Sequence, residues 1–483
     1  MVQAITDDPE RLPVNEVRRR WWALGVIALA QMLVVIDTTI VTIALPSVQR
    51  SIGLSADSRQ WVITAYTLAF GGALLLGGRL GDRFGRKRML FIGVLGFALA
   101  SAAGGAAVNP AMLIAARALQ GCFAAILAPS TLALLTLIFV SGRARGKAFG
   151  IYSAALMAGA AVGLILGGLL TQYASWRWCL YVNAPLALIV VIGGTVLPTD
   201  SLQPNRPALD IPGAALSCGG MGLLVYGLAE SGAEGWSSAL VIGSLAGAVA
   251  LLAVFLMLEA HTRKPLLPPR VLASRRRGGA LLAITVNTFA MLGMFLFMTY
   301  QLQSVMGYSP VDAGLAFLPY VAAVILTSTQ ITGRLALRTT SRNLVVVGMA
   351  VVACGLLLLS RVTPDSSYAA YILPILVLFG LGVGMVMPTS MSMATRGVGA
   401  GDVGVASATA NAAQQIGGSL GTTLLNSIAV GAAAGYVATH PHTVRLAAAA
   451  ATHGDALASL FGAAVLVVGL VVCAVLLNNP RSS

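Results

Sequence analysis

The chain has 483 residues, of which 57% are hydrophobic and 10% charged, and its formal net charge is +14. A mean hydropathy of +0.86 excludes a soluble globular protein of this length. The cysteines have no paired spacing and lie singly in apolar segments, which argues against disulfides and against a metal site: Cys122, Cys179, Cys218, Cys354 and Cys473.

Apolar segments long enough to cross a bilayer as helices recur along the whole chain. Fourteen are predicted, at 22–45, 60–79, 88–108, 111–139, 148–171, 178–197, 211–229, 238–259, 279–302, 312–333, 343–360, 368–390, 403–432 and 455–477. We therefore expect an all-α polytopic membrane protein. Because the number of spans is even, both termini should lie on the same side of the membrane.

The orientation follows from the charged string Gly78–Arg88 between the second and third spans. Charges this dense cannot lie in lipid, so the string predicts a tight turn at a membrane face, and its Lys and Arg mark that face as cytoplasmic. Most other Lys and Arg fall in the tails and alternate loops on the same side. We expect a multi-pass protein of the bacterial cytoplasmic (inner) membrane with both termini cytoplasmic, whose positive charge faces lipid headgroups and not nucleic acid.

Two ionisable residues lie deep within predicted spans, Asp37 in the first and Arg117 in the fourth. Each costs at least ~2.5 kcal/mol on insertion scales, so each needs a reason to be there. One reason is a structural ion pair that locks two helices. The other is transport, because burial disfavours an ionised Asp37 while a guanidinium favours it, and a change in hydration could then load or release a proton. A cationic substrate could compete for the same carboxylate.

Small and polar residues inside the spans suggest sliding helices and a cavity. Glycines at nearly four-residue spacing in the fifth span would let helices approach and slide: Gly159, Gly163, Gly167 and Gly168. Polar and methionine side chains are candidates for the wall of a substrate cavity, although ordinary packing explains many such residues. The candidates are Gln31, Thr38, Tyr66, Gln120, Asn183, Asn287, Met291, Met294, Gln301, Asn411, Gln414 and Gln415.

The sequence contains no GxxxxGK[ST] or HExxH string, so ATP hydrolysis and zinc chemistry have no local support. We expect no enzyme activity and no cofactor. Active transport would then need an ion gradient, and protons are the expected coupling ion.

The motifs as a group resemble the fourteen-segment drug:proton antiporters of the major facilitator superfamily, the QacA and EmrB type. The loop string matches the superfamily's motif between spans two and three, and the motifs around Asp37 and Arg117 match its first and fourth spans. More specific matches are Trp176–Pro185, Gln301–Gly314 and Gln415–Gly421. The resemblance implies that Asp37 and Arg117 couple protons to transport. It also implies a conformational gate at Gly78, Leu80, Gly81, Asp82, Arg83, Gly85, Arg86 and Lys87.

Three positions depart from the family pattern. Leu164 replaces the proline of the fifth-span antiporter motif, which puts the expected kink in doubt. Thr42 stands where many members have asparagine. The second-half copy of the loop motif, Gly333–Arg338, lacks its acidic residue, so the charge latch at Asp82 is expected to be one-sided.

The resemblance implies the major facilitator fold, with two six-helix bundles and two inserted helices, and substrate binding between the bundles. The expected parts are an N-terminal tail (1–21), a first bundle (22–197), an inserted pair (198–260), a linker (261–278), a second bundle (279–477) and a C-terminal tail (478–483). The predicted function is proton-coupled efflux of a small amphipathic drug or antibiotic by a monomer in the lipid bilayer. With one deep carboxylate, neutral, zwitterionic or monovalent substrates are expected. Alternatives are export of an endogenous metabolite, such as a siderophore, amino acid or self-made antibiotic, and a membrane sensor that transports nothing.

Overall fold

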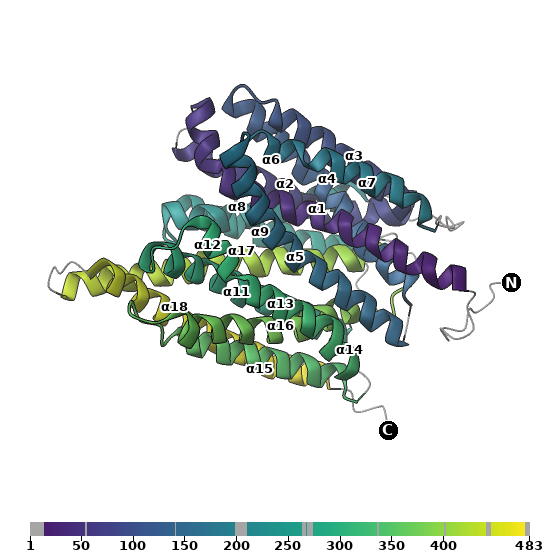
Figure 1. Ribbon diagram of the computed structural model, residues 1–483. Coiled ribbons are helices and arrows are strands. Elements are labelled where there is room, and N and C mark those ends of the chain that lie inside the picture. Colours follow the sequence, from purple (N-terminus) through teal and green to yellow (C-terminus); the bar gives the residue numbers. More distant parts are fainter. Residues whose placement is uncertain are drawn as a thin grey trace.

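The computed structural model describes residues 14–53, 56–140, 142–198, 210–262, 267, 274–335, 338–399, 402–440 and 446–478. Within these ranges, 14 helical segments are long and apolar enough to cross a membrane, which confirms the predicted number. The start of the first helix and the end of the last helix lie at the same end of the molecule (Figure 1). We call this end the termini face and the opposite end the far face.

The first helices pack on one another as a bundle, here the N-bundle. It consists of α1 (Val14–Ile52), α2 (Ala56–Phe84), α3 (Arg86–Gly105), α4 (Pro110–Ile138), α5 (Gly142–Tyr173), α6 (Trp178–Tyr181), α7 (Asn183–Gly193) and η2 (Gly194–Val196). Helices α6, α7 and η2 together form the sixth span.

The second bundle, here the C-bundle, is built from the last part of the chain. Its elements are α11 (Arg275–Tyr300), η3 (Gln301–Val305), α12 (Pro310–Ala316), α13 (Leu318–Leu326), η4 (Thr327–Ile331), α14 (Thr332–Leu335), α15 (Ser341–Leu359), η5 (Tyr368–Ile372), α16 (Leu373–Ala394), α17 (Val403–Thr439) and α18 (Leu446–Leu476).

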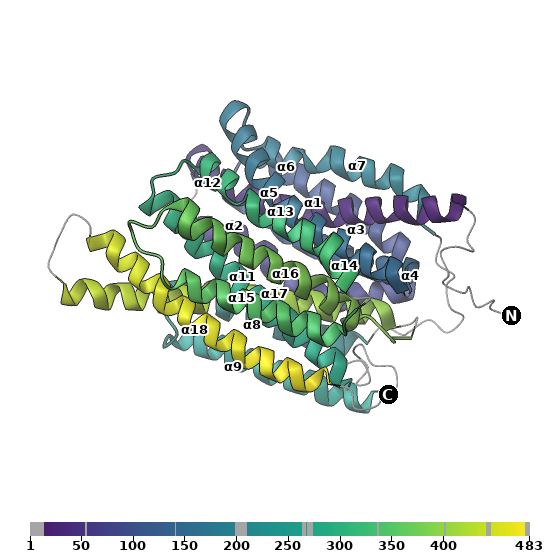
Figure 2. The same ribbon diagram turned by 60° about the horizontal axis from the view of Figure 1, so that its bottom comes forward.

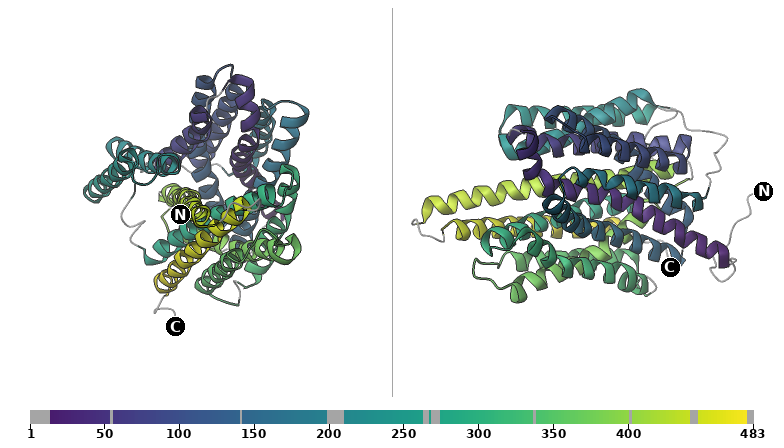
Figure 3. Two further views of the ribbon diagram at one scale, coloured as in Figure 1. Left: turned by 90° about the vertical axis from the view of Figure 1, so that its left-hand side faces the viewer. Right: turned by 45° about the horizontal axis from the view of Figure 1, so that its top comes forward.

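The inserted pair, α8 (Ile211–Glu234) and α9 (Ala239–His261), stands at the side of the molecule (Figure 3, left). Helix α8 packs on α2 of the N-bundle and also on α17 of the C-bundle. Toward the far face, the Trp236 indole donates to Ser427 Oγ of α17 at 3.0 Å. Nearer the termini face, Leu75, Ala214 and Val405 belong to one buried cluster. The inserted pair therefore touches both bundles on one flank.

The turn predicted at Gly78–Arg88 is much shorter than expected. Helix α2 continues to Phe84 and α3 begins at Arg86, so only Gly85 interrupts the helices. Gly85 has a φ of 98°, a backbone conformation that a residue with a side chain adopts only with strain. Charged residues of the string therefore lie on helix ends and not in a loop.

The last two helices extend beyond the predicted spans. Helix α17 reaches Thr439 and α18 begins at Leu446, against predicted limits of 432 and 455. Both project from the far face (Figure 2). Hydropathy identifies the lipid-crossing part of a helix, and the alanine-rich flanks here continue the helices past it.

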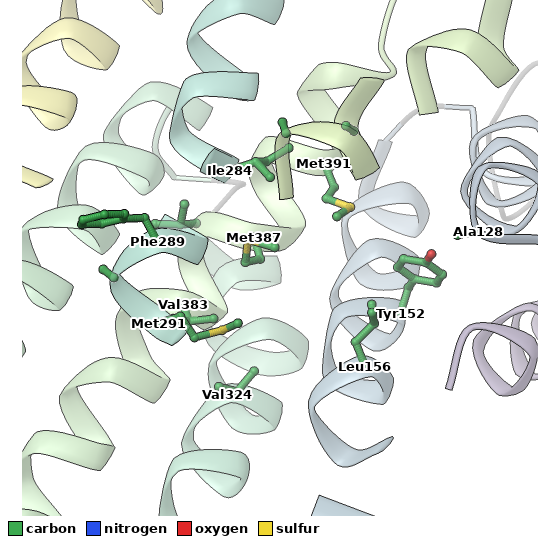
Figure 4. Packing of buried hydrophobic residues seen from close by; sticks show 14 of the residues in the cluster. Ala128, Tyr152, Leu156, Ile284, Phe289, Met291, Val324, Val383, Met387 and Met391 are labelled. Atoms are coloured by element: carbon green, nitrogen blue, oxygen red, sulfur yellow. The ribbon is translucent and has the colours of Figure 1, made fainter. Parts of the chain in front are cut away.

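Side chains from both bundles meet in one buried cluster between α5 and the C-bundle. In the close view, Tyr152 and Leu156 of α5 lie across from Met391 of α16, with Met387 and Met291 beyond (Figure 4). Close packing here holds the bundles together in this conformation.

Candidate functional site

Asp37 and Arg117, the two deep charges of the sequence, form an ion pair inside the N-bundle. Arg117 Nη1 lies 2.5 Å from Asp37 Oδ2. The Arg117 side chain is 1% exposed and the Asp37 side chain 0%. Asp37 comes from α1 and Arg117 from α4. Removing one partner of such a buried pair costs about 3–5 kcal/mol, because the other charge stays buried without compensation.

The second oxygen of Asp37 accepts two further hydrogen bonds. Gln120 Nε2 of α4 donates to Oδ1 at 3.0 Å, and Asn183 Nδ2 of α7 donates to it at 2.7 Å. Asn183 Nδ2 also donates to Ser101 Oγ of α3 at 2.8 Å. The sequence assigned Gln120 and Asn183 to the substrate cavity, and the structure places both against Asp37.

Arg117 is fixed by α2 as well as by Asp37. Its Nε donates to the Val62 carbonyl at 3.2 Å, and its guanidinium lies over the Tyr66 ring, 4.4 Å from the centroid. Nη1 also donates to Gln120 Oε1 at 2.9 Å. A guanidinium cannot lose its proton, so Arg117 is a fixed charge in this site.

This arrangement links the charge of Asp37 to the position of its helices. Both carboxylate oxygens accept hydrogen bonds from N–H donors. The donors stand on α4 and α7, while Asp37 stands on α1. The Asp37 carboxylate therefore joins α1 to two other helices of the N-bundle.

The glycine row of α5 packs against the helix that carries Asp37. A Cβ at Gly163 would overlap the Thr39 side chain, and one at Gly167 would lie 3.1 Å from Ile40 Cα. Gly159 faces Met32 in the same way, whereas Gly168 faces Val311 of α12. Helix α5 is continuous through Leu164, where the family has proline. The close approach of α1 and α5 is compatible with sliding.

The remaining cavity candidates are dispersed over both bundles. Gln31 Oε1 accepts from Thr131 Oγ1 at 2.7 Å, and Thr131 lies 3.2 Å from the Tyr152 hydroxyl. Asn287 is 0% exposed, and neither atom of its amide has a hydrogen-bond partner among the residues described. Of the other candidates, four are buried in the C-bundle and three are partly exposed; the buried ones are Met291, Met294, Gln301 and Asn411, and the partly exposed ones are Thr38, Gln414 and Gln415.

Asp82 of α2 joins the two bundles at the termini face. Its side chain is 0% exposed, its Oδ1 accepts from the Gly404 amide at 2.9 Å, and its Oδ2 accepts from the Val405 amide at 3.2 Å. These amides begin α17, where a helix favours negative charge. Arg79 and Asp402 add an ion pair across the same contact at 3.5 Å.

The other gate residues surround this contact. Arg86 Nη2 lies 2.6 Å from Asp82 Oδ1, so its positive charge balances the carboxylate that binds the first amides of α17. Lys87 Nζ donates to the Leu197 carbonyl at 2.7 Å, away from the C-bundle. Gly78 faces Gly404 so closely that a Cβ would lie 2.5 Å from its carbonyl oxygen. Leu80, Gly81, Arg83 and Gly85 complete the string on α2 and at the turn.

Arg145 of α5 makes a second contact between the bundles at this face. Its Nη2 donates to the Ser392 carbonyl at 2.8 Å and to Thr395 Oγ1 at 2.9 Å, and its Nε donates to Ser392 Oγ at 2.8 Å. Nη1 donates to the carbonyls of Phe139 and Val140 at 3.1 and 3.4 Å. The planar guanidinium satisfies carbonyls from both bundles at once.

Together, Asp82 and Arg145 match the polarity of the helix ends that they meet. The carboxylate lies at the start of α17 and the guanidinium at the end of α16, as the helix dipole favours. We call these two contacts the termini-face lock. Sequence reasoning did not identify Arg145, which counted there only as one of many basic loop residues. No local signal distinguished it from the neighbouring basic residues Arg143 and Lys147.

The sequence is similar to those of known proteins over most of its length. The sequence model of the Major Facilitator Superfamily matches residues 27–422. The chain is 48% identical over 463 residues to the puromycin resistance protein pur8 of Streptomyces alboniger, covering 95% of this chain and 92% of that protein. It is 38% identical over 409 residues to the cephamycin export protein CmcT of Amycolatopsis lactamdurans, covering 84% of each.

A solved structure supports the fold. The human organic anion transporter MFSD10 (TETRAN) superimposes with a TM-score of 0.66 at 15% identity, covering 94% of this chain and 99% of that one. At this identity the similarity concerns the arrangement of helices alone.

Proposed function

Because the chain belongs to the Major Facilitator Superfamily, we propose that it exports an amphipathic antibiotic in exchange for protons. The observation that carries this proposal is the buried ion pair of Asp37 and Arg117 in a chain whose described part contains 14 helices long and apolar enough to cross a membrane. An ionisable group in a membrane span is costly and is retained where a charge must move. Relatives named for puromycin resistance and cephamycin export support an antibiotic as the substrate.

In the proposed cycle, Asp37 takes up a proton while it is open to the outside. The neutral acid no longer attracts Arg117 as strongly, and α1, α4 and α7 repack. Arg117 retains the Gln120 and Val62 oxygens as acceptors, so its buried guanidinium still has hydrogen-bond partners. The bundles then separate at the termini face, substrate enters between them, and its binding favours return of the proton to the inside.

The termini-face lock holds the structure in the state closed at that face. We propose that this face is cytoplasmic, because its helix ends carry Arg79, Arg86, Arg145 and Lys87. The protein would thus be a multi-pass transporter of the bacterial cytoplasmic membrane, with no enzyme activity and no cofactor, the proton serving as coupling ion.

The test is proton release in everted membrane vesicles with a pH-sensitive dye. Addition of puromycin or another amphipathic antibiotic should move protons with the wild type and not with Asp37→Asn. Asp312→Asn, which changes an exposed carboxylate on α12, is the matched control and should behave as the wild type. Full drug-dependent proton movement in Asp37→Asn would refute the role of Asp37.

A second candidate is export of a metabolite made by the host cell, which the name cephamycin export protein favours for one relative. The same site would serve it. Growth of a drug-sensitive host expressing the protein, across a panel of antibiotics, distinguishes the two. Protection against several unrelated antibiotics supports drug efflux, and protection against none supports a metabolite.

A further inference from the structure

A basic pocket lies at the termini face, outside the site of Asp37. It has a volume of about 710 Å³ and is lined by Arg18, Arg19, Trp22, Thr195 and Val196. The first three residues belong to α1 and the last two to η2. The pocket is therefore formed where the sixth span ends beside the start of the first.

The positive charge of this pocket is held in place. Arg19 Nε donates to the Val196 carbonyl at 3.0 Å, so the Arg19 side chain is fixed against η2. Lys87 of α3 donates to the carbonyls of Leu197 and Thr195 at 2.7 and 3.5 Å, beside the same element. Arg18 is exposed. The pocket thus offers one hydrogen-bonded and one exposed guanidinium, with an ammonium close by.

Tryptophans place this pocket at the surface of the bilayer. Trp22 is 65% exposed, and indoles favour the layer of lipid headgroups. The neighbouring Trp21 packs on Phe139 with ring centroids 5.3 Å apart, which fixes the start of α1. From Ala23 to Ala30, α1 is apolar. A ligand of this pocket therefore has an anionic head at the level of Arg18 and an apolar body beside Trp22.

We propose that the pocket binds the phosphate headgroup of an anionic phospholipid. Guanidinium groups bind phosphate oxygens in a bidentate manner, and basic pockets beside membrane spans attract anionic headgroups. A volume of about 710 Å³ exceeds what a single phosphate fills and admits a glycerol-bearing headgroup. The first turns of α1 carry Arg18, Arg19 and Arg20 against one acid, Glu16, so the local charge is positive.

A lipid in this pocket would act on the transport helices. It would contact the start of α1, which carries Asp37, and the end of the span that carries Asn183. The Asn183–Asp37 hydrogen bond joins the same two spans at mid-membrane. Bound lipid therefore stabilises the packing of α1 against the sixth span from the termini face. This inference rests on the pocket and does not depend on the identity of the exported molecule.

The test measures lipid binding to the purified full chain by native mass spectrometry. Phosphatidylglycerol and phosphatidylcholine with the same acyl chains are the probes. We expect phosphatidylglycerol to bind the wild type more tightly, and Arg18→Gln/Arg19→Gln to weaken it at least fivefold. Arg18→Gln alone alters an exposed side chain, so it reports on binding even where the double variant is unstable. Arg275→Gln/Arg276→Gln, at the exposed start of α11, is the matched control and should leave binding unchanged.

Three results would overturn the proposal. Equal loss in the α11 control would mean that total charge attracts the lipid, with no specific pocket. Displacement of the lipid by millimolar inorganic phosphate would mean a site for a free anion. A severalfold gain in lipid binding after removal of residues 1–13, which contain Asp7, Asp8 and Glu10, would mean that the acidic tail is the occupant.

Discussion

The contact of Gly78 with α17 predicts a variant that changes conformation without changing folding. In Gly78→Ala, the new methyl would stand 2.5 Å from the Gly404 carbonyl oxygen and 2.7 Å from Ala408 Cβ. Ordinary contacts are about 3.5–4.0 Å. Neither neighbour is a flexible side chain, so α2 and α17 would have to separate by roughly 1 Å.

This separation also breaks the bonds of Asp82 to α17. The two bonds measure 2.9 and 3.2 Å, and an added ångström takes them beyond hydrogen-bond range. Overpacking costs about 1–3 kcal/mol. A value of about 2 kcal/mol corresponds to a shift of about 30-fold away from the state closed at the termini face. The gain in helix propensity from glycine to alanine is the same in both states and cancels.

A cysteine at Met391 can report this shift, because its side chain is 2% exposed and lies across from Tyr152 of the other bundle (Figure 4). The native cysteines are first replaced. A membrane-impermeant maleimide applied at the termini face should then react about 30-fold faster in Gly78→Ala than in the parent. The melting temperature should stay within a few degrees. A large fall in melting temperature with unchanged reactivity would refute the reasoning.

Two glycine controls bracket this result. Gly146→Ala places its methyl in open space and should change neither quantity. Gly77→Ala would overlap the Ala125 carbonyl within the N-bundle, so it should lower the melting temperature without favouring opening.

Further predictions concern the charges and the substrate. Arg117→Gln should lower the free energy of unfolding by about 3–5 kcal/mol, and adding Asp37→Asn should restore much of that free energy. Thermal or denaturant unfolding of both variants measures this, and losses that add up in the double variant would contradict a coupled pair. Arg145→Gln should raise maleimide reactivity at the termini face, and Arg145→Lys should do so too, since an ammonium cannot replace five guanidinium bonds; wild-type reactivity in both would exclude Arg145 from the lock. With one deep carboxylate, monovalent dyes should be exported in preference to divalent bis-cations in a fluorescence efflux assay, and the reverse preference would refute this expectation.

The spans and their two deep charges could be predicted because each is a local property of the sequence. An apolar run of about 20 residues has few alternatives to a membrane helix, and an intramembrane Asp37 needs a partner such as Arg117. Their pairing across 80 positions was one of the two interpretations drawn from the residues, and it is present in the structure as an ion pair.

The contacts between bundles could not be predicted in the same way. Arg145 meets Ser392 across 247 positions, and no local pattern distinguishes it from a loop arginine that serves only the positive-inside bias. Gln120 and Asn183 raised a similar difficulty, because a buried amide predicts a polar neighbour without identifying it. Their position beside Asp37 depends on how α1, α4 and α7 pack, which is a property of the whole bundle.

The inserted pair makes the two flanks of the protein, where the bundles meet, differ in how they face the lipid. Where α2 and α17 of the two bundles meet, α8 covers them along its length, from the Trp61–Tyr226 ring contact to the approach of Gly72 to Cys218. On the opposite flank, α5 and α13 meet without such a cover from α8 or α9. Helix α8 thus separates the contact of α2 and α17 from the surrounding lipid. We therefore expect a hydrophobic molecule that enters from the lipid to reach the space between the bundles on the side of α5.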